Sequence, residues 1–425
     1  QKKENLHLIK NFLIFVFVFL ILILSYYAFY LKNDKPINVP KCPNCNIIII
    51  TPTDIGAKHL SLYGYERETS PNLDLFSKDS IVFTNAFSQM SWSLPAVASL
   101  FTSKYPFTHG LMDREVLDSN ELTLAEILKL YNYTTIAFTG GGDYKAIYGI
   151  NQGFDIFDDD NDSIIFTGAF NRTTKAALEW LKGNKDKKFF MFLQGYDAHC
   201  PFDPPQEYRA MFEQNYAGNL NDSLCVRNSE LQDGIESSST NFQMTGFYFE
   251  NRTVSPNYAT LIPVSLDIKD IEHLKSFYDS EIRFEDYLLG SFLDNIKKLG
   301  ILDKTIIVVI GDHGEIFGSH GRLIRLGRAR GALYDEVIRI PFIIKHPYIK
   351  KSMKIDNLVE AIDVSPTILN FLGIPIRYEV QGKSLIPIIN GSNESLREYV
   401  FSGGEFSGII NMDLFPHRTS NSAIR

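Results

Sequence analysis

The sequence predicts an α/β protein with a doubly wound, mostly parallel sheet flanked by helices, preceded by one N-terminal transmembrane helix. Two patterns predict the sheet and its helices. Short, continuous apolar runs bounded by turn residues are typical of strands buried on both faces of a parallel sheet. They alternate with segments in which apolar residues recur every third or fourth position. The apolar runs are 47–50, 135–138, 189–193, 306–310 and 341–344, and the helical segments are 122–130, 173–181 and 272–299.

The N-terminal part is predicted to anchor the chain in a membrane. No charged residue occurs between Asn11 and Tyr30, and about 20 residues at 1.5 Å each match a hydrocarbon core of roughly 30 Å. A buried core helix and a cleaved signal peptide are the alternatives. The stretch exceeds the roughly 7 to 15 apolar residues of a signal peptide and ends in Tyr and Phe rather than in small residues. We expect a cytoplasmic segment 1–10, an anchor 11–30 and a proline-containing tether 31–46.

The rest of the chain is predicted to form one large domain over 47–400. Within it, 214–262 is polar, rich in Asn and Ser and without a clear period, so we expect a surface insertion there. Residues 401–425 are expected to begin a smaller C-terminal subdomain that the sequence does not complete. With the anchor, this predicts a single-pass protein of the cell membrane whose domain lies outside the cytoplasm.

Charge and composition exclude several classes of protein. The basic and acidic side chains give 42 − 50 = −8, and no basic stretch is interleaved with aromatic residues, so a nucleic-acid partner has no electrostatic basis. The apolar fraction of 44% excludes a disordered, collagen-like or coiled-coil chain. Cys42, Cys45, Cys200 and Cys225 allow two disulfides in an oxidising compartment, and their spacing does not match a structural zinc site.

Acidic residues and histidines closely follow three of the predicted strands. Functional groups gather at the carboxyl ends of strands in open α/β sheets, and oxygen and imidazole ligands suit Ca²⁺, Mg²⁺, Mn²⁺ or Zn²⁺. An Asp after a strand is also a common helix N-cap, so each residue alone is a weak signal. Together the three strand ends predict a metal site. The residues are Asp54 after 47–50, Asp197 and His199 after 189–193, and Asp312, His313 and Glu315 after 306–310.

Ser93 is predicted to stand at the N-terminus of a helix, directly before Leu94, Pro95 and a run of small residues. A serine N-cap followed by an early-turn proline is a routine structural combination. The same geometry favours an anionic ester, because backbone N–H groups and the positive end of the helix dipole face it, and it helps to activate an oxygen nucleophile. The two interpretations are compatible.

Segments in a fixed order over residues 46–390 resemble the sulfatase family of the alkaline phosphatase superfamily. Their order and spacing make the resemblance far more specific than any single motif. The segments are N-I-I-I-I, H-L-S-L-Y-G-Y-E-R-E-T-S-P-N-L-D, S-W-S-L-P-A-V-A-S-L-F-T-S-K-Y-P-F-T-H-G, D-A-H-C-P-F-D-P-P, Y-D-S-E-I-R-F-E-D, G-D-H-G-E-I-F-G-S-H-G and L-Y-D-E-V-I-R-I-P-F-I-I.

The resemblance implies an alkaline phosphatase-like fold and metal-dependent hydrolysis of sulfuric esters. By position it makes Ser93 the nucleophile, a formylglycine precursor in true sulfatases, and His199 a contact of the ester or leaving oxygen. It makes Asp54, Asp312 and His313 ligands of a divalent cation, with Ca²⁺ the first expectation and Mg²⁺, Mn²⁺ or Zn²⁺ the alternatives. The implied substrate is a sulfated, or phosphorylated, small molecule or glycan. Further substrate contacts are expected from Asp197, His320, Arg328 and Arg330.

The sequence departs from the family's pattern at the site. Thr53 stands where the family usually has an acidic residue. The formylglycine signature, Cys or Ser, x, Pro or Ala, x, Arg, ends here in Val97, and F-T-G-G-G-D-Y-K lacks the histidine that many sulfatases have there. Three hypotheses therefore stay open. They are a sulfuric ester hydrolase, a phosphoryl-transfer or phosphoester hydrolase of the same superfamily that uses unmodified Ser93, and a catalytically inactive surface binding protein.

Overall fold

The computed structural model describes residues 14–23, 38–159, 169–213, 216–218, 220, 224–227, 242–249, 259–321, 333–392, 394–406 and 419–424. For 224–227, 242–249, 259–265, 321, 404–406 and 419–424 the backbone alone is described. Arg328 and Arg330, two of the expected substrate contacts, lie outside these residues.

A mixed, eight-stranded sheet forms the centre of the domain, in the order β11-β2-β10-β9-β1-β5-β3-β4. Five neighbouring pairs are parallel, and β10 runs antiparallel to both β2 and β9. All five predicted apolar runs lie within strands. The strands are β1 (Asn46–Pro52), β2 (Ile81–Phe87), β3 (Thr134–Phe138), β4 (Ile156–Asp158), β5 (Phe189–Gly195), β9 (Thr305–Ile310), β10 (Arg339–Lys345) and β11 (Met353–Glu360).

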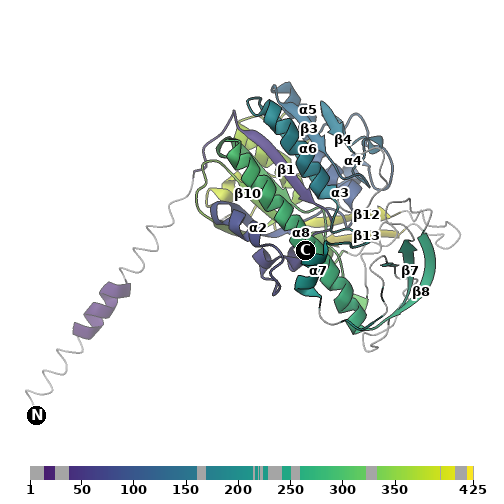
Figure 1. The fold of residues 1–425 in the computed structure, drawn as a ribbon. Coiled ribbons are helices and arrows are strands. Elements are labelled where there is room, and N and C mark those ends of the chain that lie inside the picture. The colour runs from purple at the N-terminus through teal and green to yellow at the C-terminus, as the bar shows by residue number, and fades with distance from the viewer. Residues whose placement is uncertain are drawn as a thin grey trace, which may run out of the picture.

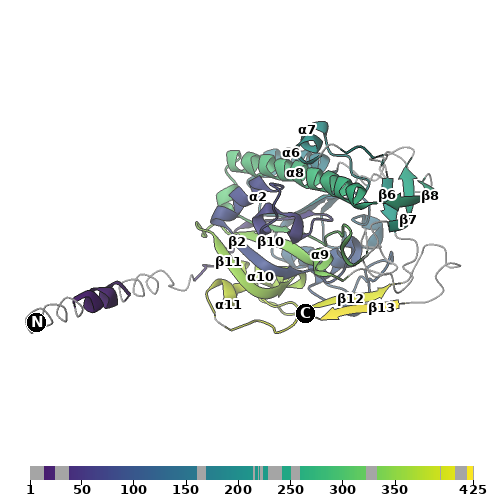
Figure 2. The ribbon, with the colours of Figure 1, turned by 90° about the horizontal axis from the view of Figure 1, so that it is seen from below.

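Helices cover both faces of this sheet, as the alternation of β1 side chains requires. Ile47 and Ile49 join the core beneath α3, α5 and α10, whereas Ile48 and Ile50 join the core beneath α2, α6 and α8. Figures 1 and 2 show α6 and α8 on one face, and Figure 2 shows α10 and α11 on the other. The helices are α2 (Pro71–Phe76), α3 (Ser93–Thr102), α4 (Pro106–His109), α5 (Leu124–Leu130), α6 (Ala169–Asn184), α7 (Gln206–Phe212), α8 (Ile268–Lys298), α9 (Asp335–Ile338), α10 (Val364–Leu372) and α11 (Ile386–Ile389).

Two smaller antiparallel sheets complete the architecture. One contains β6 (Leu224–Arg227), β7 (Phe242–Phe249) and β8 (Ala259–Leu266), so the described parts of the predicted insertion 214–262 include strands that the sequence pattern did not show. The other pairs β12 (Phe401–Phe406) with β13 (Thr419–Ile424). Figure 2 shows these two sheets as separate units beside the central one.

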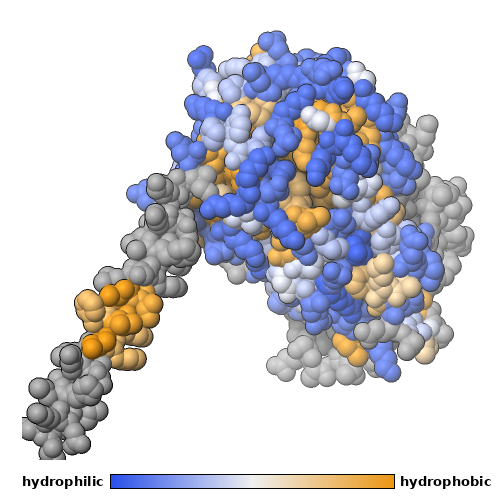
Figure 3. All heavy atoms as spheres, turned by 60° about the vertical axis from the view of Figure 1, so that its left-hand side comes forward, coloured by the Kyte–Doolittle hydropathy of each residue, from blue (hydrophilic) through white to orange (hydrophobic). Residues whose placement is uncertain are grey.

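The N-terminal stretch is described only in part. Residues 14–23 form a helix whose apolar side chains are exposed and appear orange in Figure 3. Within the portion of the chain that the structure describes, no helix is both long and apolar enough to cross a membrane. The remaining residues of the expected span 11–30 lie outside the described ones, so the anchor stays a prediction. Cys42 and Cys45, at the start of the domain, form a disulfide, and Cys200 is disulfide-bonded as well.

Candidate active site

The carboxyl ends of β1 and β9, which are neighbours in the sheet, bring two aspartates together. Asp54 lies two residues after β1, and Asp312 lies two residues after β9. The backbone N–H of Asp54 donates to Asp312 Oδ1 over 3.0 Å, and both side chains are buried. Neighbouring parallel strands end at the same edge of a sheet, so the strand order itself produces this contact.

His313 connects the two aspartates with Ser93. Its Nδ1 lies 2.9 Å from Asp54 Oδ1, and its Nε2 lies 3.4 Å from Asp312 Oδ2 and 3.1 Å from Ser93 Oγ. Carboxylate and carbonyl oxygens only accept hydrogen bonds, and Nδ1 faces two of them, since it also lies 3.2 Å from the backbone oxygen of Gly314. These contacts are shorter than the one between Nε2 and Asp312, so they favour the tautomer with the hydrogen on Nδ1. In that tautomer the lone pair of Nε2 faces the Ser93 hydroxyl. This nitrogen is therefore available to a cation, or to the proton of the serine.

Ser93 is the first residue of α3, in agreement with the predicted helix start. Trp92 before it is extended (φ −154°, ψ 158°), and Ser93 itself is 1% exposed. The first N–H groups of a helix have no partner within the helix, and they carry the positive end of its dipole. An anionic group beside Ser93 Oγ would thus meet favourable partial charges.

Asp54 has a backbone conformation that needs support. Its φ of 62° lies in the left-handed region, which costs energy for a residue with a side chain. Tyr278 of α8 supplies that support, because its hydroxyl donates to the backbone oxygen of Asp54 and accepts from the N–H of Gly56 at 3.4 Å. Burial raises the pKa of Tyr278 well above its ordinary value, so the hydroxyl keeps its hydrogen. Tyr278 begins the segment Y-D-S-E-I-R-F-E-D that resembles the family, but no pattern in the sequence predicted this role.

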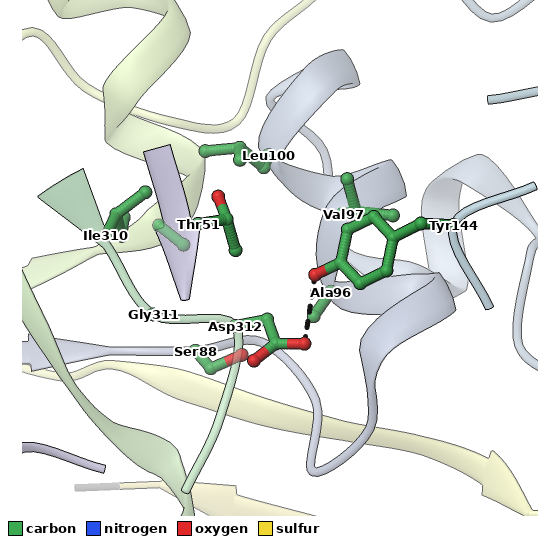
Figure 4. A pocket seen from close by; sticks show the side chains of 10 residues that line it. Thr51, Ser88, Ala96, Val97, Leu100, Tyr144, Ile310, Gly311 and Asp312 are labelled. Atoms are coloured by element: carbon green, nitrogen blue, oxygen red, sulfur yellow. Dashed lines mark hydrogen bonds between the residues drawn. The ribbon is translucent and has the colours of Figure 1, made fainter. Parts of the chain in front are cut away.

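Thr53, where the family usually has an acid, is part of a neutral network. Its hydroxyl accepts from Gln194 Nε2 at 2.7 Å and hydrogen-bonds Tyr144. Figure 4 shows the Tyr144 hydroxyl directed at Asp312, to whose Oδ2 it donates over 2.9 Å. Sequence reasoning missed Tyr144 and Gln194, since F-T-G-G-G-D-Y-K drew notice only for lacking a histidine.

Val97 lines a small cavity under α3. The cavity has a volume of about 10 Å³, roughly the space of one water molecule. Its wall is mostly apolar, with Asp312 and the Tyr144 ring on one side (Figure 4). A side chain as long as arginine would not fit there without displacing its neighbours. The space at position 97 therefore fits a valine side chain.

His199 approaches Asp54 from the loop after β5. Its Nε2 lies 3.7 Å from Asp54 Oδ2, and its Nδ1 lies 2.6 Å from the backbone oxygen of Cys200. The ring packs against Tyr196 with centroids 4.6 Å apart. Its side chain is 23% exposed, which makes it more accessible than Asp54 or His313. It is placed to meet a group that enters from solvent.

Asp197 and His320, two of the expected substrate contacts, make contacts of their own in the structure, and their predicted role stays a prediction. Asp197 is fully buried, its Oδ2 accepts from the N–H of Phe170 at 2.7 Å, and burial raises its pKa to about 6. His320 stacks on Tyr334 with centroids 3.8 Å apart, and its Nε2 lies 3.5 Å from Glu336 Oε2. Neither contact involves the Ser93 and His313 pair.

The donors at the site fit a divalent cation by type. Two buried carboxylates and one imidazole nitrogen within hydrogen-bond reach are oxygen and nitrogen ligands of the kind that Ca²⁺, Mg²⁺, Mn²⁺ and Zn²⁺ take in proteins. In the described part of the chain, however, no three His, Cys, Asp or Glu side chains are already arranged around a single point to hold an ion. Here the His313 ring lies between the carboxylates of Asp54 and Asp312.

Known proteins with the same fold provide an independent comparison. An ulvan-active sulfatase of Formosa agariphila is 27% identical over 409 residues, which cover 89% of this chain and 71% of that protein. A structure solved in complex with its substrate D-glucosamine-2-N,6-O-disulfate superposes with a TM-score of 0.67 at 18% identity, covering 90% of this chain and 87% of the other. A phosphonate monoester hydrolase of Agrobacterium radiobacter gives a TM-score of 0.68 at 18% identity, covering 90% and 85%.

A family model adds the extent of the relationship. The sulfatase model matches residues 45–374, which include β1, α3, β5 and β9 and the site residues Asp54, Ser93, His199, Asp312 and His313. Because the match spans well over half of the chain, this protein belongs to the sulfatase family.

Proposed function

We propose that this chain is a metal-dependent hydrolase of sulfuric esters that acts on a sulfated small molecule or glycan at the outer surface of a membrane. One observation carries the proposal. Ser93 Oγ stands at a helix N-terminus, 3.1 Å from His313 Nε2, and His313 contacts both Asp54 and Asp312. The sulfated glucosamine named as the substrate of a structural neighbour supports the class of substrate.

Each residue has a distinct role in this proposal. Ser93 attacks the sulfur of the ester through its hydroxyl, or as formylglycine through one hydroxyl of the hydrated aldehyde. The bond between the sulfur and the leaving oxygen breaks, the proton of the attacking hydroxyl passes to water, and the first turn of α3 stabilises the anionic group. His199, partly exposed and 3.7 Å from Asp54 Oδ2, meets the leaving oxygen and gives it a proton. Asp54, Asp312 and His313 would hold the cation. When bound, that cation would polarise the ester oxygens and offset the charge that develops on the leaving group.

A phosphoryl-transfer or phosphoester hydrolase that uses unmodified Ser93 is the second candidate. Val97 favours it, because the tightly packed cavity beside Val97 leaves no room for the arginine that completes the formylglycine signature. The phosphonate monoester hydrolase among the structural neighbours shows that this fold also hosts phosphorus chemistry. Fold alone does not decide between the two reactions.

The test is hydrolysis of paired aryl esters by matched serine variants. Wild type, Ser93→Ala and Ser99→Ala are assayed on an aryl sulfate, an aryl phosphate and an aryl phosphonate monoester with added Ca²⁺, Mg²⁺, Mn²⁺ or Zn²⁺. Ser99 is a matched control because it is buried on the same helix and hydrogen-bonded to a histidine, His109. We expect sulfate hydrolysis to fall about 1,000-fold in Ser93→Ala and to stay within about threefold in Ser99→Ala.

Other outcomes point to the other hypotheses. Faster hydrolysis of the phosphorus esters, with an intact serine in the mass spectrum of the Ser93 peptide, would establish the second candidate. Equal background rates for wild type and Ser93→Ala on every ester would leave a binding role.

A further inference from the structure

Four buried polar side chains form one hydrogen-bonded chain beneath the site. Gln194 Nε2 donates to Thr53 Oγ1 over 2.7 Å, the Thr53 hydroxyl hydrogen-bonds Tyr144, and Tyr144 Oη donates to Asp312 Oδ2 over 2.9 Å. Gln194, Thr53 and Tyr144 are 0% exposed, and Asp312 is 5% exposed. The chain thus links the ends of β5, β1 and β9 through the loop that follows β3.

The groups at the two ends of this hydrogen-bonded chain determine which atoms donate and which accept. The backbone N–H of Gly140 donates to Gln194 Oε1 over 2.6 Å, which sets the amide so that Nε2 donates to Thr53. The single hydroxyl hydrogen of Thr53 is then used on Tyr144, and the hydrogen of Tyr144 on Asp312, since an ionised carboxylate only accepts.

The loop after β3 is built to bring Tyr144 inside. Gly141 and Gly142 have positive φ angles of 86° and 61°, and a Cβ on Gly142 would lie 2.7 Å from the Tyr196 ring. The Tyr144 N–H donates to Gly141 O, and Thr139 Oγ1 donates to Tyr144 O over 2.8 Å. Only glycine at 142 permits this turn against Tyr196.

We infer that Tyr144 is a positioning residue of the active site, which orients Asp312 through its hydroxyl, and that Thr53 acts through Tyr144 rather than as a cation ligand. The inference rests on the proposed function, because it takes Asp312 as a ligand. Asp312 then receives three donors, from Tyr144 Oη, the Asp54 N–H and its neighbour His313 N–H. In this inference two carboxylates, Asp54 and Asp312, hold the cation. Thr53, at the position where the family usually has an acidic residue, is an uncharged hydrogen-bonding residue.

The competing explanation is that Tyr144 only fills space. Its ring lines the small cavity under α3 beside Val97 (Figure 4), and a phenylalanine would fill that space equally well. If so, loss of the hydroxyl would change stability and leave cation binding alone.

The experiment measures the Kd of Ca²⁺, Mg²⁺, Mn²⁺ and Zn²⁺ for the wild type by calorimetry on the full chain, and the variants are then compared with Ca²⁺ and Mn²⁺. Tyr144→Phe is expected to weaken binding about 10- to 100-fold, the usual cost of removing a hydrogen-bond partner of a metal ligand. Tyr133→Phe is the control. That hydroxyl is also buried and donates over 3.0 Å, to the backbone oxygen of Cys45, and its loss is expected to leave both Kd values within about twofold. An unchanged Kd in Tyr144→Phe would overturn the inference.

A double-mutant cycle tests the role of Thr53. If Thr53 acts through Tyr144, Thr53→Val weakens cation binding in the wild type and adds less than about twofold in the Tyr144→Phe background. If Thr53 is itself a ligand, it weakens binding by the same factor in both backgrounds, which overturns the second half of the inference. A wild type that binds none of Ca²⁺, Mg²⁺, Mn²⁺ and Zn²⁺ would overturn the metal-dependent function and the inference together.

Discussion

Helix α3 carries two buried serine–histidine pairs, and only one of them lies among carboxylates. At its first residue, Ser93 Oγ is 3.1 Å from His313 Nε2; further along the same helix, Ser99 Oγ is 3.0 Å from His109 Nε2. Both serines and both histidines are almost completely buried. Distance and burial alone therefore do not tell the two pairs apart.

The two pairs differ in what surrounds the other ring nitrogen of the histidine, Nδ1. His109 Nδ1 accepts from the N–H of Leu111 at 3.1 Å, and burial together with the nearby charge of Lys104 lowers the pKa of His109 to about 3. A neutral ring that accepts at Nδ1 carries its hydrogen on Nε2, so His109 donates to Ser99 and cannot take its proton. His313 has the opposite arrangement, because Asp54 faces its Nδ1. The carboxylate, and not the serine–histidine distance, makes the first pair a candidate site.

The largest expected effect comes from removing a carboxylate beside the first pair. Asp312→Asn keeps the shape but loses the charge, and its NH₂ group opposes one of the donors that Asp312 accepts from. We expect cation binding to weaken more than about 100-fold and ester hydrolysis to fall about 1,000-fold. Calorimetry and the aryl ester assay measure these two changes.

A matched acid provides the control for that substitution. Asp286 is equally buried and accepts from the N–H groups of Asn72 and Leu73 at the start of α2. Asp286→Asn is expected to lower stability while hydrolysis stays within about threefold. Equal losses of activity in Asp286→Asn and Asp312→Asn would show that Asp312 matters only for folding.

The residues around the first pair could be predicted from the sequence where they directly follow a predicted strand or begin a predicted helix. Apolar runs locate β1 and β9, and residues just past parallel strands meet at one sheet edge, which is why Asp54, Asp312 and His313 come together. Ser93 follows from the serine and proline at a helix start. These rules need only the strand order and the nearest residues.

Residues that reach the site from far along the chain could not be predicted in this way. Tyr144 is 168 residues from Asp312, and Tyr278 is 224 residues from Asp54, so no period or spacing connects them. His320 lies seven residues after His313 in the sequence, yet it pairs with Glu336. The edge strand β11 was missed because its exposed and polar residues interrupt the apolar pattern of a strand.

A second, smaller effect is expected from the second pair when the pH falls. The pKa of His109 in the folded chain, about 3, lies below its ordinary value of 6.5, so the native state binds fewer protons than the unfolded state. The stability that His109 contributes is therefore present above pH 6.5 and lost as the pH falls. Between pH 7 and pH 5, wild type should lose about 2 kcal/mol more unfolding free energy than His109→Gln. Urea unfolding at both pH values measures this, and equal losses would contradict a neutral, buried His109.

The smallest expected effect has the opposite sign and comes from Asp197, in the loop after β5. Burial raises the pKa of Asp197 from 3.8 to about 6, so here the native state binds more protons and stability is lost as the pH rises through this range. From pH 5 to pH 7, wild type should lose about 1 kcal/mol more unfolding free energy than Asp197→Asn. The same urea titrations measure it. If Asp197→Asn retains the full pH dependence of wild type, Asp197 is already ionised at pH 5, and its hydrogen bonds from the backbone N–H groups of Phe170, Tyr196 and Asp197 are enough to keep a buried charge.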